Sequence, residues 1–162
     1  MNSRKILLTG SFAVGKTSLF HRFLYNTFSD KYLTSIGVKV DKKLVNIEDH
    51  EIALIVWDIA GEVSQDKIPR SYFLGASAVI YVFDLSRPST FENMESDLFF
   101  LGNILPACPI KVVGNKKDLI QEVQLESIAT TISVDYFTSA KTGENVEKLF
   151  FDIGKELLSE MT

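Results

Sequence analysis

Residues 10–17, near the start of the chain, fit the phosphate-loop pattern G-x-x-x-x-G-K-[ST]. The glycines permit a tight turn whose backbone N–H groups point inward, Lys16 can reach β- and γ-phosphates, and the Thr17 hydroxyl can ligate Mg²⁺. An apolar run, residues 6–8, precedes the loop, and apolar residues at helical spacing follow it. The alternative is a glycine-rich strand-to-helix turn with an incidental lysine. The context favours a triphosphate-binding turn.

A carboxylate and a glycine follow another apolar run, residues 52–57. Asp58 can hold a water on the metal that Thr17 binds, and the unshielded N–H of Gly61 can approach a terminal phosphate. An Asp with a nearby glycine also ends many ordinary strands, so this pair alone does not separate a site from a turn.

Two later groups of residues could select a purine base. Asp118, at the end of the N-K-K-D run 115–118, can accept hydrogen bonds from guanine N1–H and the exocyclic amine, whereas adenine leaves it unpaired. Residues 139–141, S-A-K, can bring a backbone N–H to the guanine carbonyl oxygen and a lysine to the base. For the first group the alternative is a solvated charged turn, which suits Lys117 better than Lys116. The second group is weak evidence by itself.

Short apolar runs alternate with helical patterns along the chain, and they predict the strands and helices that must position these groups. Strands are expected at residues 5–9, 52–57, 78–84, 110–114 and 134–138, with residues 38–47 forming a hairpin onto 51–57 across the turn 48–50. The pattern predicts an α/β fold with a mostly parallel sheet, covered on both faces, and one antiparallel edge strand. Ligands of such sheets bind at the carboxyl ends of the strands, which is where the polar groups lie.

Two helices have clear signatures. Residues 89–92, S-T-F-E, form a capping-box pattern that predicts a helix running towards Leu105. A last helix, about residues 145–159, places its apolar residues on one stripe, which indicates core packing.

Composition bounds the remaining possibilities. The 162 residues are 46% apolar, which predicts one globular domain over 1–162. The net charge of −4 and the lack of a basic patch disfavour nucleic-acid binding. Cys108 is the single cysteine, so an internal disulfide is excluded and a reducing compartment is expected. The apolar stretches are too short to cross a bilayer. We expect a monomer.

Taken together, these motifs resemble the Ras superfamily of small GTPases, and in particular its Rab branch. The resemblance covers essentially the whole chain and includes S-I-G-V at 35–38, W-D at 57–58, R-S-Y-F-L-G-A at 70–76, Asp84 and S-T-F-E-N at 89–93. It implies a P-loop NTPase fold with a six-stranded sheet, one strand antiparallel, and five helices on both faces. The implied function is a Mg²⁺-dependent GTP/GDP switch with slow hydrolysis.

The resemblance also implies site residues. Glu62, Lys16 and Gly61 stand at catalytic positions, and Thr17, Ser35 and Asp58 at metal positions. Ser35 replaces a threonine and keeps its hydroxyl and N–H; Thr34 is a rival in register. Phe28 would pack edge-on against guanine, and Asp30 would lie near the ribose. The full set of implied nucleotide-binding residues is Ser11, Phe12, Ala13, Val14, Gly15, Lys16, Thr17, Ser18, Phe28, Asp30, Ser35, Gly61, Asn115, Lys116, Asp118, Ser139, Ala140 and Lys141.

Two departures from the family pattern bear on hydrolysis. Phe12 stands where Ser or Gly is usual and crowds the space of an activating arginine, and Glu62 stands where Gln is usual. An ionised glutamate can only accept hydrogen bonds and adds charge beside a negative transition state. Both favour slow turnover, and the alternative is a GTP-binding scaffold with negligible hydrolysis. A kinase of the same loop class is disfavoured by residues 115–118.

Partners implied by the family are effectors, exchange factors and GTPase-activating proteins, which would bind through residues 35–40, Trp57 and 62–72. Val40, Trp57 and Tyr72 match an apolar effector triad, with Val40 replacing phenylalanine; a half-buried strand residue is an equally good interpretation of Trp57. The last residues include no cysteine for lipid attachment, so either a tail is missing or the protein is not prenylated, as in prokaryotic relatives. The expected location is cytoplasmic, or peripheral to a membrane if the full-length protein is lipidated.

Overall fold

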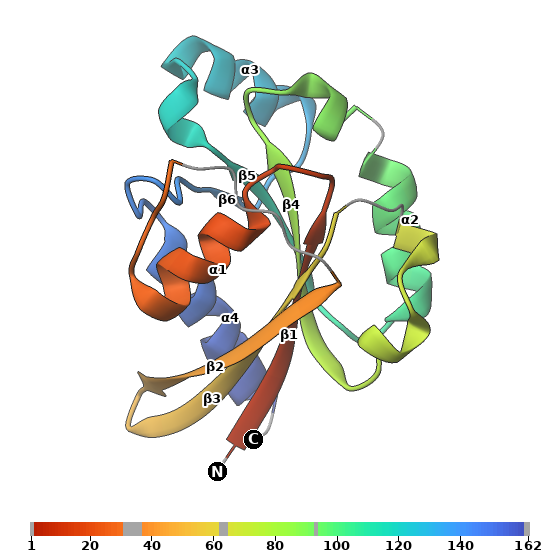
Figure 1. Ribbon diagram of the computed structural model, residues 1–162, viewed down its shortest axis with the longest axis vertical. Helices are drawn as coiled ribbons and strands as arrows, with labels where there is room; N and C mark the ends of the chain where they lie inside the picture. The colour runs from red at the N-terminus through yellow and green to blue at the C-terminus, as the bar shows by residue number, and fades with distance from the viewer. Residues whose placement is uncertain (1, 31–36, 62–64, 93, 161–162) are drawn as a thin grey trace.

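The computed structural model describes residues 2–30, 37–61, 65–92 and 94–160, which build a six-stranded sheet in the order β2-β3-β1-β4-β5-β6 (Figure 1). The β2–β3 pair is antiparallel, and every other neighbouring pair is parallel. The predicted sheet with one antiparallel edge strand is therefore confirmed. The strands are β1 (Asn2–Gly10), β2 (Val38–Ile47), β3 (His50–Ile59), β4 (Ala76–Asp84), β5 (Ile110–Asn115) and β6 (Tyr136–Phe137).

The hairpin turn is tighter than predicted. Ile47 pairs with His50, so only Glu48 and Asp49 form the loop, and their φ values are 48° and 68°. Positive φ at both central residues is typical of the type I′ turn, whose twist matches that of the strands it joins.

Helices cover both faces of the sheet (Figure 1). On one face lie α1 (Lys16–Tyr25) and α4 (Val146–Ser159), where the Phe23 and Phe150 rings stack with centroids 3.8 Å apart. On the other face lie α2 (Met94–Ile104) and α3 (Glu122–Thr131). The predicted apolar stripe of the last helix is confirmed, because Val146, Leu149, Phe150, Ile153 and Leu157 are all buried.

The described residues contain four α-helices where the family resemblance implied five. Between β3 and β4 the described chain instead forms two 3₁₀ helices, η1 (Gln65–Lys67) and η2 (Arg70–Tyr72). Pro69 lies between them with φ −53° and ψ 129°, and its ring cannot donate a helical hydrogen bond. Gln65 is buried and accepts a hydrogen bond from the Thr9 hydroxyl at 2.7 Å, so η1 is tied to β1.

The predicted capping box at residues 89–92 is wrong. A 3₁₀ helix, η3 (Pro88–Thr90), occupies that position, and α2 begins only at Met94. The buried Thr90 hydroxyl accepts a hydrogen bond from the Asp84 backbone N–H at 2.9 Å and donates to the Arg87 carbonyl at 2.8 Å. Thr90 therefore closes the turn that follows β4 and does not cap a helix.

Candidate functional site

The phosphate loop joins the carboxyl end of β1 to the start of α1, and its glycines are there for steric reasons. Gly15 has φ +97°, and a Cβ at this residue would lie 2.2 Å from Asn115 Nδ2. A Cβ on Gly61, which follows β3, would lie 2.4 Å from Lys16 Nζ and 2.6 Å from the Ser11 carbonyl oxygen. Only glycine leaves room for these neighbouring atoms. The loop and the Gly61 segment therefore form one cradle.

Lys16 is buried inside this cradle. Its ammonium donates to the carbonyl oxygens of Ser11 at 2.6 Å and Gly10 at 3.2 Å. Burial lowers the pKa of Lys16 to about 8, and the charge of Asp58 partly opposes that shift. The chain thus holds a buried cation at the centre of the loop. An anionic ligand bound there would raise the pKa of Lys16 again and favour its charged form.

The oxygens expected to hold a metal come from two elements. The Thr17 hydroxyl, in the first turn of α1, donates to Asp58 Oδ2 on β3 at 2.7 Å, and both side chains are buried. Hydroxyl and carboxylate oxygens are the hard ligands that Mg²⁺ takes in proteins, so this pair fits that ion. Ser35, the third predicted ligand, and Glu62 lie outside the described residues.

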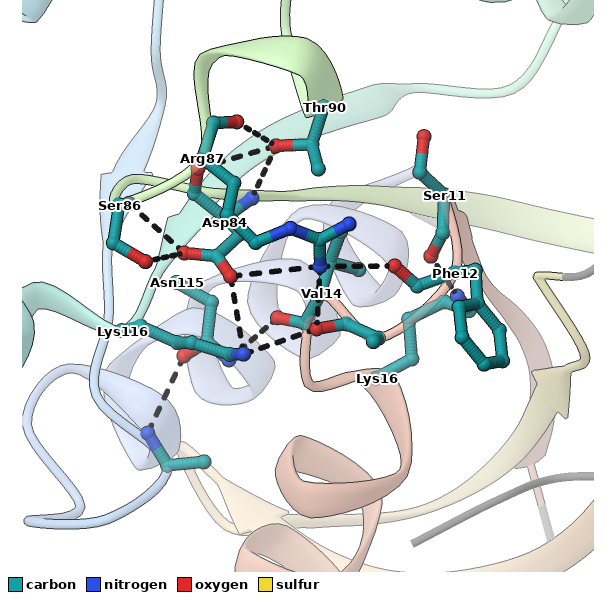
Figure 2. A network of polar contacts seen from close by, with 12 residues as sticks. Ser11, Phe12, Val14, Lys16, Asp84, Ser86, Arg87, Thr90, Asn115 and Lys116 are labelled. Carbon is teal, nitrogen blue, oxygen red and sulfur yellow. Dashed lines mark hydrogen bonds and ion pairs between the residues drawn. The ribbon is translucent and has the colours of Figure 1, made fainter. Parts of the chain in front are cut away.

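Asn115, at the end of β5, connects the phosphate loop to the segment that follows β6. Its Nδ2 donates to the Val14 carbonyl at 3.1 Å, and its Oδ1 accepts from the Thr138 hydroxyl at 3.0 Å and from the Ala140 N–H at 3.3 Å. The side chain is almost fully buried. Three loops are therefore placed relative to one another by a single amide (Figure 2).

The remaining residues of the 115–118 run point in different directions. Lys116 adopts a left-handed backbone conformation and sends its ammonium behind the phosphate loop, 3.0 Å from both the Ala13 carbonyl and Asp84 Oδ2. Lys117 pairs with Glu144 at 2.7 Å at the surface, as the solvated-turn interpretation of that lysine predicts. Asp118 accepts a hydrogen bond from the buried Ser139 hydroxyl at 2.7 Å.

These elements surround a cavity of about 290 Å³. Most predicted nucleotide-binding residues line it: Phe12, Ala13, Gly15, Lys16, Thr17, Ser18, Phe28, Asp30, Gly61, Asn115, Lys116, Asp118, Ala140 and Lys141. At the rim, Lys141 Nζ lies 3.9 Å from Asp30 Oδ1. The lining also includes Ser29, Ala60 and Leu119, which adjoin predicted residues but carry no motif of their own.

Three predicted residues lie beside the cavity without lining it. The Val14 side chain is fully buried in the core under α1, so only its backbone serves the loop. Ser11 contributes its carbonyl to Lys16, and Ser139 supports Asp118 through its hydroxyl. The predicted contacts of these three residues with the ligand stay predictions.

Sequence reasoning also missed side chains that hold the loops from outside. Arg87 donates to the Phe12 and Ala13 carbonyls, and Arg22 to the Ala140 and Lys141 carbonyls. Neither arginine belongs to a recognisable motif. Each arginine is also far along the chain from the carbonyls to which it donates.

Residues 5–159 match the Ras family. The chain belongs to that family. It is 32% identical to Ras-related protein Rab-13 of Bos taurus, covering 95% of this chain and 79% of that protein. It is 36% identical to RABA1c of Arabidopsis thaliana (92% and 72%) and 33% identical to Rab-1 of Theileria annulata (98% and 76%).

Membership makes the protein a Rab-like small GTPase, a GTP-binding switch built on the Ras P-loop fold. The predicted family and fold are thereby confirmed. Within the described residues, no helix combines the length and apolar character needed to span a bilayer.

Proposed function

We propose that this Ras-family protein binds GTP and GDP with Mg²⁺ and hydrolyses GTP slowly, acting as a Rab-like switch. The observation that carries the proposal is that the phosphate loop, Asp118 and Ala140 line one cavity, and that Asn115 bonds the phosphate loop to the Ala140 segment. A triphosphate and its base would thus be held by one rigid frame.

Guanine is the base this frame would select. Asp118 offers a carboxylate to the N1–H and amine of guanine, and the Ala140 backbone lies at the same end of the cavity. Adenine would offer the carboxylate no donor from the base, which penalises adenine nucleotides strongly. Phe28, which also lines the cavity, would cover the edge of the base.

At the other end, Lys16 and the loop N–H groups would neutralise the phosphate oxygens, and Gly61 would donate to the γ-phosphate. Thr17, Ser35 and Asp58 would hold Mg²⁺, directly or through water. When bound, the ion supplies positive charge against the β- and γ-phosphates. This chain's own contribution is a buried cation and a set of donors fixed before the ligand arrives.

The second candidate is a GTP-binding scaffold with negligible hydrolysis. Phe12 favours it, because the ring stands at the lip of the cavity with 44% of its surface exposed. An arginine supplied by an activating protein would meet this ring. Glu62 favours it too, since a carboxylate cannot donate to the transferring phosphoryl group.

Partner proteins would bind beside the γ-phosphate. Val40 pairs across the hairpin with Trp57, and the Trp57 and Tyr72 rings lie with centroids 6.1 Å apart. Val40 is 47% exposed and Trp57 is half-buried. An effector would contact these three side chains, with a smaller residue where phenylalanine is usual.

The nucleotide released from freshly purified protein tests the binding proposal, and we expect GDP or GTP. Single-turnover hydrolysis by wild type, Glu62→Gln and Phe12→Gly then separates the two candidates, with affinities measured alongside. Losing one positioned donor typically slows a reaction by roughly 10²–10³-fold, so Glu62→Gln should accelerate turnover by up to that factor. Ordinary small-GTPase rates in wild type, unchanged by either substitution, would contradict the slow-hydrolysis proposal.

A further inference from the structure

Two arginines, Arg87 and Arg22, do not line the nucleotide cavity but donate hydrogen bonds to carbonyls of residues that do. We propose that Arg87 is a positioning residue for the phosphate loop and that Arg22 has the matching role for the base-recognition loop. Affinity for the phosphates and affinity for the base would then depend on different arginines. This inference rests on the proposed guanine-nucleotide function.

Arg87 acts on the outer surface of the phosphate loop. Its Nη1 donates to the Phe12 carbonyl at 3.2 Å and to the Ala13 carbonyl at 3.1 Å. Figure 2 shows the Phe12 carbonyl pointing toward the guanidinium while the Phe12 ring points away from it. The next carbonyl, that of Val14, is held by Asn115 at 3.1 Å. Lys116 also donates to the Ala13 carbonyl at 3.0 Å, so three successive carbonyls of the loop are held by side chains.

The consequence follows from the planarity of the peptide bond. In a trans peptide the carbonyl of one residue and the N–H of the next point in opposite directions. Carbonyls 12, 13 and 14 each accept from a side-chain donor, so the N–H groups of Ala13, Val14 and Gly15 point away from those donors. Those N–H groups are the donors a phosphate requires. Arg87 therefore orients donors without touching the ligand.

The arginine is itself held in place. Its backbone N–H donates to the Asp84 carbonyl at 3.0 Å, and its carbonyl accepts from the Thr90 hydroxyl at 2.8 Å. Its guanidinium lies 3.8 Å from the fully buried Asp84 carboxylate, which also pairs with Lys116 at 3.0 Å. The Ser86 hydroxyl and N–H donate to the same carboxylate at 2.6 and 2.9 Å. A clamp fixed this way loses little entropy when the ligand binds.

Arg22, on α1, makes the equivalent contacts at the other end of the cavity. Its Nε donates to the Ala140 carbonyl at 2.8 Å and its Nη2 to the Lys141 carbonyl at 2.6 Å, while Nη1 donates to Asn26 at 3.1 Å. By the same peptide geometry, this orients the N–H groups of Lys141 and Thr142. Arg22 is thus a matched comparison, because it has the same chemistry on the loop that faces the base.

The test measures two affinity ratios by competition against fluorescent GDP. The GDP:GMP ratio reports the phosphate half of the site, and the GDP:ADP ratio reports the base half. Arg87→Ala should lower the GDP:GMP ratio by about tenfold, the value of one charged hydrogen bond, and leave GDP:ADP unchanged. Arg22→Ala should do the reverse. Arg87→Lys, which keeps a charged donor on a side chain of different shape, should recover part of the GDP:GMP ratio.

Two results would overturn the inference. One is equal weakening of all three nucleotides by both alanine variants, which is what general loss of structure produces. The other is an unchanged GDP:GMP ratio in Arg87→Ala. Thermal unfolding of each variant checks the fold, and Arg87→Lys gives a second measurement if Arg87→Ala is unstable. Failure of wild type to prefer guanine nucleotides would contradict the proposed function instead, so the two failures are distinguishable.

Discussion

Asp118 carries the proposed choice of base, and its carboxylate is held by the buried Ser139 hydroxyl at 2.7 Å. A site built to hydrogen-bond one edge of a base rejects ligands that leave it unpaired by on the order of 10⁴-fold or more. We therefore expect wild type to bind GTP at least that much more tightly than ATP. Asp118→Asn should weaken guanine binding and favour xanthine, whose 2-oxo group accepts where guanine donates.

Competition binding with GTP, ATP and XTP measures both effects. Lys117, which directly precedes Asp118, pairs with Glu144 at the surface. Lys117→Ala is therefore the control and should leave the base preference as it is in wild type. Comparable affinities of wild type for ATP and GTP would refute base recognition by this carboxylate.

Lys16 gives the site a dependence on pH. Burial lowers its pKa to about 8 in the free protein, and phosphate oxygens favour its charged form, so ligand binding should raise that pKa. Affinity for GDP should therefore be greatest below pH 8 and fall by up to about tenfold per pH unit above it. The same lowered pKa makes the free protein more stable as pH rises from about 8 towards 10.5, because the unfolded chain binds more protons in that window.

Titration calorimetry at pH 7, 8 and 9 in buffers of different ionisation enthalpy reports both the affinity and the proton uptake. Lys16→Arg keeps the charge throughout this range and is the matched control, since its affinity should vary less with pH. No proton uptake above pH 8 in wild type would mean that Lys16 is charged before the ligand binds.

Among the elements, the segments around the γ-phosphate are the ones proposed to change with nucleotide. Residues 30–38 contain Ser35 and residues 61–72 contain Gly61, and hydrolysis would remove the γ-phosphate that both contact. We expect backbone hydrogen exchange to be slower in both segments with a non-hydrolysable GTP analogue than with GDP. Helix α4, whose apolar stripe is buried in the core cluster with α1, should exchange equally in the two states.

Equal protection of these segments in both nucleotide states would argue that the protein is not a switch. The 3₁₀ helix η1 refines where the change should be largest. Gln65 is 3% exposed and bonded to Thr9 of β1, so this turn is anchored to the sheet, and the exchange difference should be greatest on the Gly61 side of it.

Across the whole molecule, stability depends on the core under α1 and α4. Phe150 is fully buried and stacks on Phe23, so Phe150→Ala should cost about 3–5 kcal/mol of unfolding free energy. Its neighbour Phe151 is 42% exposed, and Phe151→Ala should stay within about 0.5 kcal/mol of wild type. Urea unfolding at fixed nucleotide concentration makes the comparison, because bound ligand adds stability by mass action. Equal costs for the two would contradict the described packing of α4.

Much of this molecule was predictable because its signals are local. The P-loop glycines, the apolar strands and the stripe on residues 146–157 each follow from a spacing that one element imposes on its own residues. A local signal predicted the wrong structure where its residues make other contacts in the folded chain. The pattern at residues 89–92 is typical of a helix cap, but the Thr90 hydroxyl bonds Asp84 and Arg87 and so closes the turn after β4. In the segment between β3 and β4, Pro69 separates η1 from η2, and the described residues there form no α-helix.

The sequence by itself determined the family, the order of the elements and the residues whose types can bind phosphate, metal and base. Only the tertiary structure decided which side chains orient those residues. Arg87 and Phe12 are separated by 75 positions, and Arg22 and Ala140 by 118, so no spacing rule connects them. Their contacts exist because the sheet brings the ends of β1, β4, β5 and β6 to one edge. The reason is physical: a carbonyl carries no sequence signature, and what holds it depends on which chain segment folding places behind it.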